Sequence, residues 1–244
     1  MDVALEIAVQ DPEGVAVAVT GGADRIELCT ALALGGLTPS AGLVRVAVAA
    51  GRPVHVLVRP RAGGFEYSTV ELAVILDDVR RALDLGARGV VVGGVRGDRV
   101  DTVLVERVRA LAGPAEVTFH RAFDSLPDLE AALDVLVGLG VDRVLTSGGA
   151  NRVAEGLPQL ERLVARADGR LEVVAGSGVD ASTVRAVVAT GVATVHASAK
   201  RTVVEASRVD LGSLARAGAS ALEATDEAAV RALRTALDEL RRPG

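Results

Sequence analysis

Gly22-Ala23-Asp24-Arg25-Ile26 begins with a glycine, continues with a small apolar and a polar residue, and leads into a run that alternates apolar and polar side chains. The same pattern recurs at Gly86-Ala87-Arg88-Gly89-Val90, Gly140-Val141-Asp142-Arg143-Val144 and Gly191-Val192-Ala193-Thr194-Val195. A glycine permits the left-handed turn in which many helices end, and the next residue can pack back on that helix end. Each copy therefore predicts the end of a helix followed by a strand.

Eight strands follow from these turns and from the apolar runs between them. We predict them at Ala4–Val9, Arg25–Cys29, Val54–Arg59, Gly89–Gly93, Glu116–Arg121, Arg143–Ser147, Glu172–Ala175 and Thr194–Ala197. Each gap has room for one crossover helix, which predicts a parallel sheet. Eight such units are typical of a (β/α)₈ TIM barrel, an α/β fold that would cover residues 1–244 as a single domain. A doubly wound sheet is the alternative, but no Gly-x-Gly-x-x-Gly follows the first strand.

Helix-capping residues agree with this alternation. Asp11-Pro12 is expected to open the first helix, and Ser68-Thr69-Val70-Glu71 has the form of a capping box before a helix that ends at Gly86. Asp128, Asp180 and Thr225 are expected to cap three further helices, the last of which runs to about Leu240. Residues 201–224, between the eighth strand and that last helix, are rich in Ala, Ser and Gly and are predicted to be irregular.

The composition excludes several classes of protein. The net charge of −5 argues against nucleic acid as the main partner. The N-terminal residues do not resemble a signal peptide, and no apolar run reaches the roughly 18 residues needed to span a membrane. A single cysteine, Cys29, excludes an internal disulfide and suits a reducing compartment. We therefore expect a cytoplasmic protein.

Polar residues alternate with apolar ones along several predicted strands. Because the apolar face of each strand should meet the helices, the polar face should look into the barrel. The side chains expected there include all three histidines, four charged residues and three small polar ones: Glu6, Arg25, Glu27, Cys29, His55, Arg59, Thr118, His120, His196 and Ser198. Charges inside a barrel are costly unless they are paired. We expect a paired, structural network at the bottom of the barrel and a site at the C-terminal ends of the strands.

The end of the fifth strand brings His120, Arg121 and Asp124 together within five residues. One interpretation is a catalytic set in which His120 transfers protons and Arg121 binds an anion, with Glu27 from the second strand as a further catalytic group. The alternative is a turn stabilised by an Arg121–Asp124 pair.

Anion-binding residues are expected around the same end of the barrel. Arg59 and Arg61 suit a carboxylate or phosphate, unless they are paired with Glu6 and Glu27. The turn Gly176-Ser177-Gly178-Val179-Asp180 could offer backbone N–H groups to a phosphate, or it could be a plain strand-to-helix turn. The expected site is completed by Gly176, Gly178, Thr146, Ser147, His196 and Ser198.

Cys29 and Lys200 each allow two interpretations. Cys29 could be a thiolate metal ligand or nucleophile, or a small buried apolar side chain. Lys200, the sole lysine, could form a Schiff base, but its neighbour Arg201 suggests solvated charge instead. No His-x-x-x-His or Cys-x-x-Cys pattern exists, which argues against a closed zinc site.

The chain resembles the CutC family, which is named for copper homeostasis. The resemblance rests on stretches in family order: Gly22–Cys29, Gly35–Ser40, Arg59-Pro60-Arg61, Phe65–Ser68, Val117–Asp124, Arg143–Gly148, Gly156-Leu157-Pro158 and His196–Ala199. The segment Ser207–Gly212 matches only in part. The resemblance implies a TIM barrel, a cytoplasmic location, a homo-oligomer (dimer or tetramer) and a link to copper, with copper(I) as the expected cofactor.

Two positions depart from the family pattern. Relatives often carry cysteine where this chain has Ala8, so a two-thiolate Cu(I) site cannot form here. Relatives also tend to have an aspartate beside the arginine pair, where this chain has Ala62-Gly63-Gly64. The first hypothesis is therefore a copper-handling protein, with Cys29 as the candidate ligand. The second is an enzyme acting on a small anionic, for example phosphorylated, metabolite at the C-terminal barrel face. The third is a scaffold barrel with a fully paired lumen.

Overall fold

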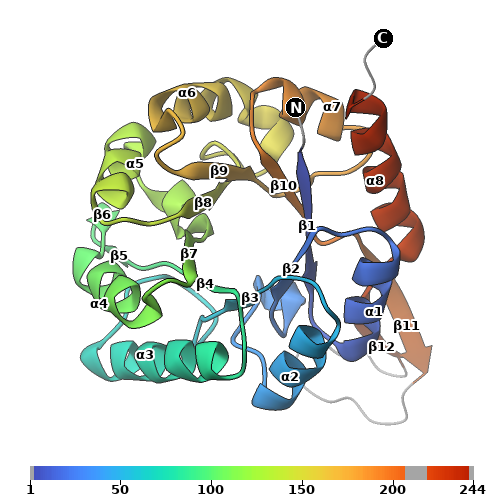
Figure 1. The fold of residues 1–244 in the computed structure, drawn as a ribbon, viewed down its shortest axis with the longest axis horizontal. Helices are drawn as coiled ribbons and strands as arrows, with labels where there is room; N and C mark the ends of the chain where they lie inside the picture. Colours follow the sequence, from blue (N-terminus) through green and yellow to red (C-terminus); the bar gives the residue numbers. More distant parts are fainter. Residues whose placement is uncertain (1–2, 207–218, 242–244) are drawn as a thin grey trace.

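Eight parallel strands close into a barrel, and helices surround it (Figure 1). The computed structural model describes residues 3–206 and 219–241. The barrel strands are β1 (Ala4–Val9), β2 (Arg25–Leu28), β3 (Val54–Leu57), β4 (Gly89–Val92), β7 (Glu116–Phe119), β8 (Arg143–Thr146), β9 (Glu172–Ala175) and β10 (Thr194–Ala197). Strand β1 pairs with β2 on one side and with β10 on the other, which closes the ring. The predicted TIM barrel is confirmed.

One α-helix follows each barrel strand on the outside (Figure 1). The helices are α1 (Pro12–Thr20), α2 (Ala41–Ala49), α3 (Thr69–Asp84), α4 (Thr102–Ala112), α5 (Leu129–Gly138), α6 (Leu157–Ala167), α7 (Val184–Ala189) and α8 (Glu227–Arg241). Short 3₁₀ turns lie above the strand ends at η1 (Leu32–Leu34), η2 (Arg121–Ser125) and η3 (Val153–Glu155), and a small hairpin joins β5 (Val95–Arg96) to β6 (Arg99–Val100). These connections build the mouth of the barrel.

The predicted strand positions agree closely with the structure. β1, β9 and β10 have the predicted bounds, and the other five strands start as predicted but end one or two residues earlier. The residues lost from these five strands are Cys29, Val58, Arg59, Gly93, His120, Arg121 and Ser147. The backbone N–H groups of Cys29, Val58 and His120 still bond to a neighbouring strand, but the chain then turns into the loops, so the errors fall at the mouth of the barrel.

Most predicted caps are also present. The Asp11 side chain accepts from Gly14 N at 2.7 Å, and Ser68 with Glu71 forms the full capping box of α3. Asp128 accepts from Ala131 N at 2.9 Å. Asp180 instead caps a separate turn, because its carboxylate accepts from Thr183 N at 3.0 Å while α7 starts only at Val184.

The segment before the last helix departs from its predicted description. Residues 200–206 form β11 (Lys200–Ala206), which pairs antiparallel with β12 (Ala219–Thr225), so the irregular structure predicted for 201–224 is wrong at both ends. In Figure 1 this ribbon lies beside α1. Residues 207–218 lie outside the described residues, and so does the partial family match at Ser207–Gly212. Thr225 ends β12, and Asp226 rather than Thr225 caps α8, accepting from Ala228 N at 3.1 Å.

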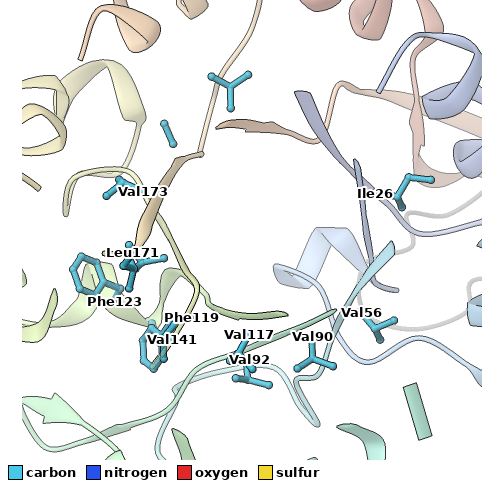
Figure 2. Packing of buried hydrophobic residues seen from close by; sticks show 14 of the residues in the cluster. Ile26, Val56, Val90, Val92, Val117, Phe119, Phe123, Val141, Leu171 and Val173 are labelled. Carbon is cyan, nitrogen blue, oxygen red and sulfur yellow. The ribbon is translucent and has the colours of Figure 1, made fainter. Parts of the chain in front are cut away.

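The apolar core lies between the strands and the helices. Figure 2 shows Ile26, Val56, Val90, Val117 and Val173 projecting from the outer side of the strands. Phe119 and Phe123 are fully buried in the same layer. Since alternate side chains point the other way, the polar residues between them project into the lumen, as predicted.

The bottom of the lumen is filled by a paired ionic network. Arg143 lies 2.6 Å from Glu116 Oε2 and donates from Nε to Thr118 Oγ1 at 3.2 Å. His55 lies 3.3 Å from Glu116, and burial lowers the pKa of His55, so the ring is held neutral. On the other side Arg25 lies 4.0 Å from Glu172. Apart from Thr118, the third residue of β7, these side chains come from the first or second residues of their strands, which confirms the structural network expected at the bottom.

Candidate functional site

A cavity of about 320 Å³ opens at the C-terminal ends of the barrel strands. This is the end at which TIM-barrel enzymes place their sites. Its walls are both apolar and polar, and they are formed by Ala8, Glu27, Cys29, Leu32, Leu34, Gly35, Gly36, Leu57, Arg59, Phe65, His120, Arg121, Leu145, Ser177, Gly178, His196, Ala197, Ser198 and Lys200. The cavity thus brings together the predicted site residues Glu27, Cys29, Arg59, His120, Arg121, Gly178, His196 and Ser198.

Three ionisable side chains from neighbouring strands form an array at the base of the cavity. His196 Nδ1 lies 2.8 Å from Glu6 Oε1, and Glu6 Oε2 lies 3.4 Å from Arg25. Glu27 Oε2 lies 3.9 Å from the same His196 nitrogen, too far for a hydrogen bond, and has no other partner among the described residues. The sequence predicted these side chains to face the lumen, but only the register of β10, β1 and β2 brings them together.

The array sets the charge of its members. Burial raises the pKa of Glu27 to about 7. Burial would also raise the pKa of Glu6, but the hydrogen bond and charge of His196 hold it well below its usual range. Burial would lower the pKa of His196, yet the charges of Glu27 and Glu6 raise it above its usual value. Near neutral pH, Glu6 is therefore ionised, while Glu27 and His196 can each take up or release a proton.

His120 has a different environment. Its Nδ1 accepts a hydrogen bond from Ala122 N at 3.1 Å, so the other ring nitrogen, Nε2, carries the proton. Burial, followed by the charge of Arg59, lowers the pKa of His120 to about 3. The ring packs against Gly93, where an added Cβ would lie 2.4 Å from His120 Nδ1. This arrangement keeps the imidazole neutral and favours hydrogen-bond donation over the proton transfer that the sequence suggested.

Arg59 is held by backbone carbonyls. Its guanidinium donates to Leu34 O at 2.8 Å, Gly36 O at 2.9 Å and Gly63 O at 2.8 Å, and lies 5.3 Å from the Phe65 ring centre. The suggested pairing with Glu6 and Glu27 is therefore wrong. Arg59 Nε remains buried without a partner, and its side chain lines the cavity.

Arg61 points away from the cavity. It pairs with Glu71, the capping-box residue of α3, and donates to Gly64 O at 2.9 Å and Glu66 O at 2.6 Å. Its guanidinium lies 5.1 Å from the Tyr67 ring centre. The structure thus separates the two arginines, and Arg61 stabilises a loop outside the cavity.

Asp124 acts as a structural clamp between two strand ends. Its carboxylate accepts from Arg121 Nε at 2.8 Å, from Ser147 N at 3.1 Å and from Gly149 N at 3.0 Å, and it also accepts from the Thr146 hydroxyl. Thr146 and Ser147 are fully buried beside Asp124. The side chains of Asp124, Thr146 and Ser147 do not line the cavity. The contacts match the turn stabilised by an arginine–aspartate pair, which was the alternative to a catalytic Asp124.

The turn after β9 presents unpaired backbone groups to the mouth of the barrel. Gly176 N donates to Thr146 O at 3.0 Å and is used structurally. Ser177 and Gly178 have φ values of 79° and 81°, and their N–H groups find no partner in the described part of the chain. The guanidinium of Arg152, which sequence reasoning missed, lies against Gly178. The turn, with the positive charge of Arg152 beside it, has the donors and the charge that suit an anion.

Cys29 lies in the apolar part of the wall. The thiol is fully buried beside Leu57, Val91 and Leu32, and its Sγ lies 3.5 Å from Val9 O. Burial, and then the charge of Glu27, raises its pKa, so the thiolate that copper(I) prefers is disfavoured. Since the chain has no second cysteine and Ala8 lines the same cavity, this donor set does not fit a tight Cu(I) site.

Among the described residues, one cluster of side chains has the donor atoms to hold a metal ion: those of Glu6, Glu27 and His196 lie within 4.8 Å of one another. Cys29 is not a member. Glu6 is already used by His196 and Arg25. Two of the three donors, Glu6 and His196, are therefore already bonded to each other, and Glu27 Oε2 has no partner within the described residues.

Several cavity walls carried little signal in the sequence. Phe65 contacts both His120 and Arg59: its ring centre lies 5.0 Å from that of His120 and 5.3 Å from the Arg59 guanidinium. In the sequence, only its aromatic character hinted at a role. Leu32 and Leu34 come from the 3₁₀ turn η1. Lys200 lines the cavity while its Nζ lies 2.5 Å from Glu223 of β12, a contact that depends on the ribbon that sequence reasoning did not predict.

Comparison with known proteins gives consistent results. The model of the CutC family matches residues 3–201. The family protein CutC of Agrobacterium fabrum is 44% identical over 235 residues, which cover 96% of this chain and 93% of the relative. The human copper homeostasis protein cutC homolog is 40% identical over 237 residues, covering 94% and 87%. The crystal structure of CutC from Streptococcus agalactiae superposes with a TM-score of 0.77 at 31% identity, covering 80% of this chain and 98% of that one.

None of the described helices combines the length and the apolar character that a membrane-crossing helix needs.

Proposed function

This chain belongs to the CutC family, and from that membership we propose that it acts in copper homeostasis. The observation that carries the proposal is the 40% identity, across 94% of the chain, with a human protein named for copper homeostasis. We propose the cytosol as its location, because the free thiol of Cys29 suits a reducing compartment.

The proposed role does not depend on tight capture of copper(I) at Cys29. Copper(I) favours two or more soft sulfur ligands, and the wall around Cys29 offers one buried thiol whose pKa is raised. The proposed role in copper homeostasis is then better explained by a small molecule that the cavity binds or converts than by a copper ion stored at Cys29.

We expect Cys29→Ser to change copper(I) affinity less than tenfold, about 1.4 kcal/mol, because one buried thiol contributes little. The measurement is an anaerobic competition titration against a chromogenic copper(I) chelator, with wild type and variant compared after their thermal transitions are shown to agree. A loss of a hundredfold or more, about 2.7 kcal/mol, would make direct copper binding at Cys29 the mechanism.

The same two proteins test the cellular role. A strain that lacks the gene is expected to change its growth under copper stress, and both wild type and Cys29→Ser are expected to restore it. Unchanged copper tolerance in the deletion strain would contradict a role in copper homeostasis for this chain.

A second candidate function is action on a small anionic molecule in the cavity. It is favoured by three buried polar atoms without partners, Glu27 Oε2, Arg59 Nε and His120 Nε2, whose side chains all line the one cavity. A buried polar group left without a hydrogen bond costs about 1–3 kcal/mol, so a ligand that supplies partners would be bound favourably. The unpaired N–H groups of Ser177 and Gly178 and the charge of Arg152 suit a negative group at the rim.

We expect small phosphate esters and carboxylates to raise the melting temperature of the wild type, and His120→Asn to weaken that binding at least tenfold. A hydrogen bond to a charged group contributes about 1.5–3 kcal/mol, and asparagine keeps the acceptor for Ala122 N while removing the Nε2 donor. Thermal shift followed by calorimetric titration provides the measurement.

Arg61→Gln is the matched control for this experiment, since Arg61 is a cation near the same loops but outside the cavity. It should leave ligand binding unchanged. If Arg61→Gln abolished binding while His120→Asn did not, the cavity would not be the binding site.

A further inference from the structure

The first observation concerns the direction of the His196 ring. Its Nδ1 faces Glu6 at 2.8 Å, which leaves Nε2 as the ring nitrogen available on the cavity side, and Nε2 has no partner among the described residues. Glu6 is itself fixed by Arg25 at 3.4 Å. A carboxylate that orients an imidazole whose far nitrogen meets the substrate is the arrangement used for proton transfer in many enzymes.

The second observation is a carboxyl group beside this imidazole that takes no part in the pairing. Glu27 comes from β2, the strand next to Glu6 on β1, and makes no hydrogen bond through Oε2. Ala8 is its register partner on β1 and lines the cavity in front of the array. The small side chain of Ala8 leaves room there for a substrate atom.

The third observation is a set of donors elsewhere on the cavity wall. His120 follows β7, which lies opposite β1 in the strand order of the barrel. Its neutral ring and the Arg59 guanidinium both contact Phe65, with separations of 5.0 Å and 5.3 Å. A neutral imidazole N–H and a nearby positive charge stabilise an oxygen on which negative charge develops.

We propose that this cavity catalyses proton transfer on a small hydroxycarbonyl compound, an aldehyde or ketone with a hydroxyl on the neighbouring carbon. Glu27 and His196 are the catalytic residues, and Glu6 is the residue that positions His196. The inference rests on the second candidate function, because it needs a small molecule bound in the cavity. A volume of about 320 Å³ is at the low end of the range for ligand pockets and suits a substrate of a few carbon atoms, with or without a phosphate.

The step is balanced without a further reactant. The Glu27 carboxylate removes the proton from the carbon that carries the hydroxyl, and the electrons of that C–H bond form a carbon–carbon double bond. The carbonyl electron pair moves to oxygen, which takes a proton from Nε2 of the His196 imidazolium to give an enediol. Return of a proton from Glu27 to the former carbonyl carbon, with loss of the other hydroxyl proton to His196, completes an isomerisation.

The electrostatics of the cavity agree with these assignments. Burial raises the pKa of Glu27 to about 7, which suits a group that must take up and return a proton near neutral pH. The pKa of His196 is raised by the charges of Glu27 and Glu6 although burial alone would lower it, which keeps a proton available for donation. Lys200 is paired with Glu223 at 2.5 Å, which disfavours a Schiff base as the competing route.

The test uses the full chain in D₂O with four probes: glycolaldehyde, dihydroxyacetone, dihydroxyacetone phosphate and glyceraldehyde 3-phosphate. Proton NMR follows the loss of the C–H signal next to the carbonyl as deuterium enters, and saturation-transfer NMR on the same samples reports binding. We expect the wild type to catalyse exchange in at least one probe, and Glu27→Gln and His196→Asn each to slow it at least a hundredfold while binding persists. General acid–base groups contribute about 10²–10⁴ in rate.

Two further variants and a control distinguish the orientation of His196 and the space in the cavity from the acid–base groups themselves. Glu6→Gln is expected to lower the exchange rate at saturation with little change in the half-saturating concentration, because it disturbs the orientation of His196. Ala8→Leu should fill the cavity and abolish both binding and exchange without touching the acid–base groups. Glu130→Gln, on the outer face of α5 beside Arg166, is the control and should change neither.

Each outcome has a definite meaning. Binding without exchange in the wild type would overturn the proton-transfer proposal and leave the cavity as a binding site. Exchange that survives in both Glu27→Gln and His196→Asn would overturn the residue assignment. Neither binding nor exchange with any of the four probes would overturn the hydroxycarbonyl class and, with a negative anion screen, the second candidate function as well.

Discussion

Asp124→Ala is expected to lower the free energy of unfolding by about 4 kcal/mol, because several donors lose one shared acceptor. The carboxylate, whose side chain is 8% exposed, binds two backbone N–H groups, Ser147 N and Gly149 N, together with Arg121. Alanine leaves these donors facing a small gap into which water enters only in part. Urea denaturation of wild type and variant gives the difference directly.

Asp128→Ala is the matched control for this prediction. Asp128 also carries a carboxylate in the same connection, but it is exposed and caps α5 through one bond to Ala131 N at 2.9 Å. Its replacement should cost about 1 kcal/mol. If Asp124→Ala were as stable as Asp128→Ala but bound no ligand, Asp124 would belong to the binding or catalytic machinery after all.

A second large effect is expected from pH through His120. Burial and the charge of Arg59 lower its pKa to about 3 in the folded protein, whereas the unfolded chain titrates near 6.5. Between these values the unfolded state binds more protons, so this contribution to stability is complete above pH 6.5 and is lost as the pH falls towards 3. The loss is about 2 kcal/mol between pH 7 and pH 5 and about 4 kcal/mol between pH 7 and pH 3.

His120→Asn removes this dependence and keeps the acceptor for Ala122 N. The free energy of unfolding of the variant, measured from pH 7 to pH 5, should therefore fall by about 2 kcal/mol less than that of the wild type. Comparing the two proteins at each pH cancels other titrating groups, including Glu27, whose raised pKa acts in the opposite direction. Equal slopes for the two proteins would mean that folding does not lower the pKa of His120.

The barrel could be predicted because its signals are local. A glycine, a cap and a two-residue alternation each depend on a few neighbouring residues, and together they located every barrel strand and the lumen face of Glu6, Glu27 and His196. The ribbon formed by β11 and β12 was missed for the same reason. Its second strand, Ala219–Thr225, is mostly Ala and Ser, which carry little strand preference of their own.

The partners of the site residues could not be predicted in the same way. Arg59 and Arg61 lie two residues apart, yet one binds loop carbonyls beside the cavity and the other binds Glu71 outside it. Beyond the last paired residue of a strand, alternation no longer fixes the direction of a side chain. Thr146, Ser147 and Asp124 were therefore placed at the correct end of the barrel but assigned to the cavity instead of to the clamp beside it.

The ionic floor of the barrel also limits how anything can travel through the molecule. Arg143, Glu116 and His55 fill the lumen beneath the array of Glu6, Glu27 and His196, and Arg25 adds a second cation at the same level. A copper ion moving along the axis would have to pass two guanidinium groups. The barrel is therefore closed at its lower end and does not form a channel. A molecule that enters the cavity must leave by the same opening before the next one can bind.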